Sequence, residues 1–168
     1  DTAADLEKIF ENKAPGYCYT RVGNPTVTAF ENRITKLEGG MASIACASGM
    51  AAIMNAILNI VRSGDEIVSS ASLYGGSIDL FRDIEEFGIK TRYVKNNDWE
   101  AIEGAINEHT RLLFAETIGN PCLDVTDVER LAEIAHAHKI PLILDNTTAT
   151  AYLFQGLKHG ADIVVNSS

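Results

Sequence analysis

Short apolar runs of strand length alternate with amphipathic stretches from about Met41 to the last residue, and this alternation constrains the fold more than any other feature. In residues 127–137, for example, Leu131 and Ile134 fall on one helical face, whereas Glu129 and Glu133 fall on another. Repeated strand–helix–strand units with short links predict an α/β fold with a mostly parallel sheet and helices on both faces.

The expected elements can be assigned by residue range. Strands are predicted at residues 43–47, 66–69, 90–94, 111–115, 142–145 and 162–165. Helices are predicted at residues 3–12, 26–38, 49–61, 77–87, 99–107 and 127–137.

Composition narrows the functional class. The net charge of −9 argues against nucleic-acid binding, which needs a basic face. No apolar run approaches the roughly 18 residues of a membrane span, and no signal peptide is visible. The three cysteines lack metal-ligand spacing, and the four histidines are expected at the surface. We therefore expect a cytoplasmic protein in a reducing compartment, with no metal site.

Residues 1–40 differ from the rest of the chain. Their two expected helices are joined by KAPGYCYTRVGNP, which is rich in glycine, proline and aromatic residues and has no strand pattern. We expect residues 1–40 to form an arm that contacts a neighbouring subunit, with an ordinary surface loop as the alternative. Residues 41–168 are expected to form the α/β core.

The segment CASGMAAIMNAIL places Ser48, Gly49 and Met50 between an expected strand and a helix N terminus. Free N–H groups and the helix dipole make such a turn suitable for an anion, and a glycine allows close approach. The alternative is a serine N-cap followed by a glycine. Neither the dinucleotide-binding glycine pattern nor a P-loop is present, which disfavours a Rossmann oxidoreductase.

Three further residues follow expected strands. Tyr74 could stack on a flat ligand and move protons, or it could cover the core. Asn120 could bind a ligand or belong to a Gly-Asn-Pro turn. Asp145 ends a buried strand, where a carboxylate costs several kcal/mol unless a metal, a protonated ring nitrogen or several donors meet it. It could also cap the next helix.

Eight ordered segments together resemble one family, the Cys/Met-metabolism enzymes that use pyridoxal 5'-phosphate (PLP). These segments are YTRVGNPT, LEGG, ASGMAA, GDEIVSS, LYGGS, ETIGNP, DNT and HGADIVVNSS. The resemblance runs from about Tyr17 to the last residue. It implies the PLP-dependent transferase fold of the aspartate-aminotransferase type, with PLP as cofactor and an amino acid as substrate.

The resemblance also implies roles for single residues around the cofactor. The Ser48 turn would place the amides of Gly49 and Met50 on the phosphate, with a further contact from Ser167. Tyr74 would stack on the ring and assist proton transfer as a catalytic residue. Asp145 would pair with the pyridinium nitrogen, which makes the ring an electron sink.

Further implied contacts involve four residues. Asn120 would lie by the ring hydroxyl and the substrate carboxylate, and Thr147 would pack near the ring. Tyr19 and Arg21 would reach the phosphate of a neighbouring subunit, in a homo-oligomer expected to be a tetramer of dimers that share active sites. Arginine suits phosphate because its donors form a fork.

The family's Schiff-base lysine is expected just beyond Ser168, two positions further along the chain. We therefore expect residues 41–168 to be an incomplete PLP-binding domain, without its C-terminal remainder, and a 168-residue product to be inactive alone.

The implied reaction is γ-replacement on O-acetylhomoserine by sulfide or a thiol, which gives homocysteine or methionine. Methionine γ-lyases often carry cysteine at the position of Gly76, which favours the sulfhydrylase reading. Cystathionine γ-synthase, cystathionine γ-lyase and methionine γ-lyase remain alternatives, as does a non-catalytic protein of the same fold. Ala151 departs from the proline usual in the family, and we assign it no function.

Overall fold

The computed structural model describes residues 2–11 and 13–168, and its centre is a five-stranded sheet in which every pairing between strands is parallel. The order across the sheet is β2-β1-β3-β4-β5, so the chain moves outward from β1 in both directions. The strands are β1 (Glu66–Ser70), β2 (Lys90–Val94), β3 (Thr110–Glu116), β4 (Leu142–Asp145) and β5 (Ile163–Val165).

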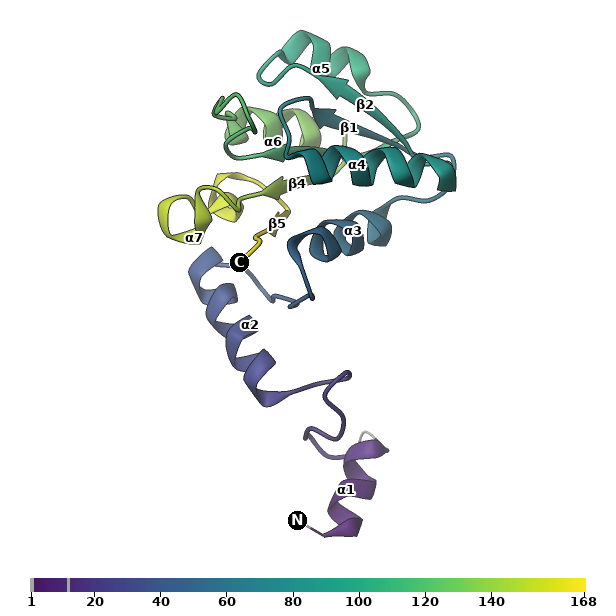
Figure 1. Ribbon diagram of the computed structural model, residues 1–168, viewed down its shortest axis with the longest axis vertical. Coiled ribbons are helices and arrows are strands. Elements are labelled where there is room, and N and C mark those ends of the chain that lie inside the picture. The colour runs from purple at the N-terminus through teal and green to yellow at the C-terminus, as the bar shows by residue number, and fades with distance from the viewer. Residues whose placement is uncertain (1, 12) are drawn as a thin grey trace.

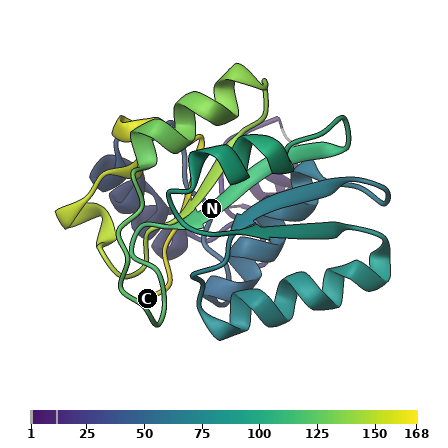
Figure 2. The same ribbon diagram turned by 90° about the horizontal axis from the view of Figure 1, so that it is seen from above.

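Helices cover both faces of this sheet (Figure 2). Helices α3 (Gly49–Ile60) and α4 (Gly75–Ile84) pack on one face, and α5 (Trp99–Ala105) and α6 (Val128–Ala137) pack on the other. In β3, Leu112 and Phe114 belong to the first core, whereas Leu113 and Ala115 belong to the second. A strand buried on both faces must be apolar in succession, as parallel strands are. The predicted α/β architecture is confirmed.

The remaining elements are short or lie toward the N terminus. They are α1 (Ala3–Phe10), α2 (Pro25–Glu38), α7 (Thr150–Leu153) and the 3-10 turns η1 (Glu85–Phe87) and η2 (Gly156–His159). The helix predicted at residues 77–87 begins two residues earlier and ends as η1. Residue 12, in the first predicted helix, lies outside the described residues. None of the described helices is both long and apolar enough to cross a membrane.

The N-terminal arm extends away from the sheet (Figure 1), and α1 buries none of its residues. Helix α2 begins where the Asn24 side chain accepts the amide hydrogens of Thr26 and Val27, with Pro25 in the first turn. It ends at Gly39, whose φ of 71° suits glycine. The arm is therefore built from local signals rather than from packing within this chain.

The strand predicted at residues 43–47 is wrong. This segment runs along α2, where the Ala45 amide donates to Glu31 Oε1 at 2.9 Å and Thr35 Oγ1 donates to Ser43 Oγ at 2.8 Å. A strand needs a neighbouring strand for its backbone groups. Here side chains of α2 bind the segment instead, so its apolar composition does not lead to a strand.

A buried ion pair joins the starts of β1 and β2. Glu66 is 7% exposed, and its carboxylate accepts from Arg92 Nε at 2.6 Å and from Asn107 Nδ2 at 2.7 Å. These hydrogen bonds, from Arg92 first and then Asn107, lower the pKa of Glu66 to about 2 from its ordinary 4.5. The contribution of this group to stability is therefore present above pH 4.5 and declines as the pH falls toward 2.

We expect Glu66→Gln to lower the free energy of unfolding at neutral pH by about 1 kcal/mol, because the Arg92 side chain is half exposed and solvent weakens the pair. The difference from the wild type should shrink between pH 4.5 and 2. Urea unfolding across this range measures it, with the exposed Glu86→Gln as control. A constant difference at all pH values would contradict the assignment.

Candidate functional site

The N terminus of α3 and the end of β5 meet closely. Ser48 Oγ accepts the Ala51 amide hydrogen at 3.1 Å, so Ser48 is the N-cap of this helix. A Cβ at Gly49 would lie 2.6 Å from Ser167 Cβ and 2.7 Å from Ser167 Oγ. Only glycine permits this approach. The fold thus brings a serine hydroxyl to free helix N–H groups, where an anion binds well.

Asp145 and Ser167 are linked through Thr147. Asp145 Oδ1 accepts from the Thr147 amide at 2.9 Å and from Thr147 Oγ1 at 2.5 Å. Thr147 Oγ1 in turn accepts the Ser167 amide hydrogen at 2.9 Å. The capping alternative for Asp145 is therefore partly met, because the carboxylate binds the loop that follows β4. Both hydrogen bonds use Oδ1, and among the described residues no hydrogen bond reaches Oδ2.

A second carboxylate, Glu116, lies beside Asp145, because the two residues are register partners at the carboxyl ends of β3 and β4. Glu116 is 6% exposed, and its Oε1 accepts the Tyr74 amide hydrogen at 2.6 Å. Burial, with a further contribution from Asp145, raises the pKa of Glu116 to about 7. The sequence reading gave this residue no role, although it ends a buried apolar run as Asp145 does.

The ring of Tyr74 lies over Gly76. A Cβ at Gly76 would be 2.6 Å from Tyr74 Cε1 and 3.4 Å from Met50 Sδ. Tyr74 is 55% exposed, so it presents a free ring beside the first turn of α3 instead of covering the core. The structure thus brings Tyr74, Met50 and the Gly49 turn together.

The loop that holds Asn120 packs against the loop after β1. A Cβ at Gly119 would lie 2.7 Å from Ser72 Cβ, and Ser72 Oγ donates to Asp124 Oδ1 at 2.5 Å. Asn120 itself is exposed. Its side chain is therefore available at the same edge of the sheet as Tyr74.

Tyr19 and Arg21 are not brought to this cluster. They lie in the link between α1 and α2, at the end of α2 away from the sheet (Figure 1), with Arg21 Cζ 5.2 Å from the centre of the Tyr19 ring. The link has no strand, as predicted. Any contact of these two residues with a ligand therefore requires another partner.

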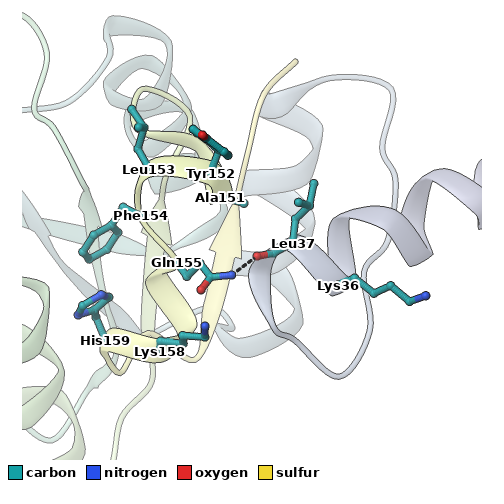
Figure 3. A pocket seen from close by; sticks show the side chains of 9 residues that line it. All are labelled: Lys36, Leu37, Ala151, Tyr152, Leu153, Phe154, Gln155, Lys158 and His159. Carbon is teal, nitrogen blue, oxygen red and sulfur yellow. Dashed lines mark hydrogen bonds between the residues drawn. The ribbon is translucent and has the colours of Figure 1, made fainter.

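A cavity of about 400 Å³ lies elsewhere, between the end of α2 and the α7–η2 segment (Figure 3). Leu37, Phe154 and Lys158 are among its lining residues, and Gln155 Nε2 donates a hydrogen bond to the Leu37 carbonyl oxygen across it. None of the predicted site residues lines it. The candidate site is instead the open edge formed by the loops after β1, β3, β4 and β5.

This edge has two chemically different ends. Free amides at α3 and the Ser167 hydroxyl favour an anion, whereas Asp145 and Glu116 favour a cationic or N–H donor. An exposed aromatic ring stands between the loops at Tyr74. The arrangement suits a flat ligand with an anionic group at one end and a basic nitrogen at the other.

Curated relatives are similar over nearly all of the chain. The O-acetyl-L-homoserine sulfhydrylase of Leptospira meyeri is 46% identical over 161 residues, which cover 95% of this chain and 36% of that protein. The homocysteine synthase of Schizosaccharomyces pombe is 43% identical over 163 residues, covering 96% of this chain and 38% of that protein. The chain thus spans less than half the length of these relatives.

Solved structures share the fold. A protein from Campylobacter jejuni assigned as an O-acetylhomoserine (thiol)-lyase, whose structure contains N'-pyridoxyl-lysine-5'-monophosphate, has a TM-score of 0.91 at 36% identity, covering 99% of this chain and 42% of that one. The O-acetylhomoserine sulfhydrylase of Wolinella succinogenes has a TM-score of 0.81 at 44% identity, covering 84% and 40%.

The sequence profile described as "Cys/Met metabolism PLP-dependent enzyme" matches residues 2–168. Since the match extends over nearly the whole chain, the predicted resemblance and fold type are confirmed. This chain belongs to the Cys/Met metabolism family of PLP-dependent enzymes.

Proposed function

We propose that the chain forms the N-terminal part of an enzyme that replaces the acetyl group of O-acetylhomoserine with sulfide or a thiol, giving homocysteine or methionine. The names of the curated relatives and of the solved structures support this reaction. The observation that carries the proposal is the approach of Ser167 to Gly49, with Asp145 held nearby through Thr147.

These residues fit PLP. The amides of Gly49 and Met50, at the turn capped by Ser48, and the hydroxyl of Ser167 would hold the phosphate. Asp145 would bind the ring nitrogen through Oδ2, since Thr147 already occupies Oδ1. When bound, PLP supplies a conjugated ring that accepts electrons from the substrate's α carbon.

The chain's own side chains then position the reacting groups. Tyr74 would lie on the ring and move a proton through its hydroxyl, while Glu116 fixes the Tyr74 backbone. Asn120, exposed on its loop, would bind the substrate carboxylate and the ring hydroxyl. Thr147 would pack beside the ring and keep Asp145 in place. The lysine that binds the cofactor is expected two positions beyond Ser168.

The geometry at Gly76 favours replacement over methionine elimination. A side chain at this position would meet the Tyr74 ring, because even a Cβ would be 2.6 Å from its Cε1. The cysteine often found here in methionine γ-lyases would therefore require a different Tyr74 position. This supports the sulfhydrylase reading over its alternatives.

A second copy of the chain would complete the site. Apolar side chains on and after α2 are exposed, including Phe30 at 50%, Met41 at 103% and Ile44 at 85%. Such a surface is typical of an interface. We propose an active-site-sharing dimer within a tetramer, with Tyr19 and Arg21 of residues 1–40 on the neighbouring phosphate. The free state of all three cysteines fits a cytoplasmic location.

A substrate panel tests the reaction. The full-length enzyme should convert O-acetylhomoserine and sulfide to homocysteine, and Asp145→Asn should lower kcat/KM about a hundredfold or more, because the ring nitrogen loses its charged partner. The exposed Asp79→Asn should match the wild type. Efficient formation of ketobutyrate from methionine alone would show that the reaction is wrong, and PLP binding without any turnover would indicate a non-catalytic protein.

Glu116 should make stability depend on pH. Because its pKa is raised to about 7 in the folded protein, its contribution is present below pH 4.5 and is lost as the pH rises through 7. Glu116→Gln keeps an acceptor for the Tyr74 amide and should gain stability relative to the wild type over this range. Urea unfolding of the cofactor-free protein measures this, with the exposed Glu100→Gln as control. Parallel pH curves would refute the assignment.

Phe30→Glu should dissociate the proposed oligomer, because a charge would replace an exposed apolar side chain on α2. Sedimentation velocity of the full-length protein measures the change. Phe87→Glu alters a similarly exposed ring next to α4 and serves as the control. An unchanged mass for Phe30→Glu would rule out α2 as the interface.

A further inference from the structure

A buried side-chain pair joins α2 to the end of β5. Glu38 is the last residue of α2 and only 4% exposed, and its Oε1 accepts from Asn166 Nδ2 at 2.8 Å. The two residues are 128 positions apart. Asn166 directly precedes Ser167, so the pair acts on the segment that lies against Gly49.

This pair is a poor way to gain stability. Glu38 Oε2 and Asn166 Oδ1 are both buried, and neither finds a hydrogen-bond partner among the described residues. Buried acceptors without donors each cost about 1–3 kcal/mol, and a buried carboxylate costs more. Apolar side chains of the same size would pack here at lower cost. A polar pair in such a place therefore points to a role in position rather than in stability.

The geometry shows what the pair positions. The carbonyl oxygen of Val165 accepts from the Asn146 amide at 2.8 Å, and the Ser167 amide donates to Thr147 Oγ1 at 2.9 Å. Both bonds come from the loop after β4 and engage the residues on either side of Asn166. Glu38 engages Asn166 itself, from a helix outside the sheet. The three contacts together hold residues 165–167 from two sides.

We propose that Glu38 is a positioning residue, which holds Asn166 so that Ser167 lies against the first turn of α3 and can bind a phosphate. The inference deepens the proposed function, because it rests on the phosphate cradle of Gly49 and Ser167 but not on the particular reaction. Loss of the Glu38 contact should weaken binding of the phosphate group and leave the ring contacts of the ligand unchanged.

Three variants separate position from stability. Glu38→Gln keeps the acceptor and adds an N–H donor that can satisfy Asn166 Oδ1. Glu38→Met is similar in size but leaves the Asn166 amide without its partner. The double variant Glu38→Met with Asn166→Leu removes both polar groups, which relieves the cost of unpaired buried atoms but abolishes the contact.

The experiment compares binding of PLP and of pyridoxal, which lacks the phosphate, to the cofactor-free full-length protein, together with thermal unfolding. Glu38→Met should weaken PLP binding about tenfold, as expected for one lost hydrogen bond, and change pyridoxal binding less than about twofold. Glu38→Gln should bind PLP within about twofold of the wild type. The double variant should recover the wild-type Tm and still bind PLP weakly.

Equal weakening of both ligands in Glu38→Met, or recovery of PLP affinity in the double variant, would show that Glu38 is merely structural. A wild type that binds PLP no better than pyridoxal would refute the cradle itself and both proposals with it. A protein that keeps the contrast between the two ligands but fails to turn over O-acetylhomoserine would contradict only the reaction, with the role of Glu38 supported.

Discussion

The parallel pairing of β3 with β4 is the constraint on which the rest of the site depends. It places Glu116 beside Asp145, and the hydrogen bond from the Thr117 amide to the Asp145 carbonyl oxygen extends the pairing past the strands. From this edge, Glu116 reaches the Tyr74 amide and Asp145 reaches Thr147, which binds Ser167. A shift of register would separate all of these contacts at once.

Burial on both faces explains why the polar groups gather at this edge. Strands such as β3 present apolar side chains to helices on each side, so charged and hydroxyl groups can lie only where the strands end. The first turn of α3 adds partial positive charge at one end, and the two carboxylates add negative charge at the other. A dipolar flat cofactor is therefore oriented by the fold itself, before any catalytic group acts.

The sequence was sufficient to predict most elements and most of the site, but not the partners of each residue. Apolar periodicity predicted all five strands, because burial on a sheet leaves a local pattern. The same pattern failed at residues 43–47, since the side chains of Glu31 and Thr35 bind that segment. Glu116 was missed because its proximity to Asp145 and Tyr74 depends on which strands are neighbours.

The sequence by itself determined the α/β class, the family resemblance and the identity of the residues at the strand ends, because these depend on local composition and order. Only the tertiary structure decided the strand order β2-β1-β3-β4-β5, the contact of Gly49 with Ser167 and the buried pair of Glu38 with Asn166. Such contacts join residues more than 100 positions apart. They arise from the packing of whole elements, which no local pattern encodes.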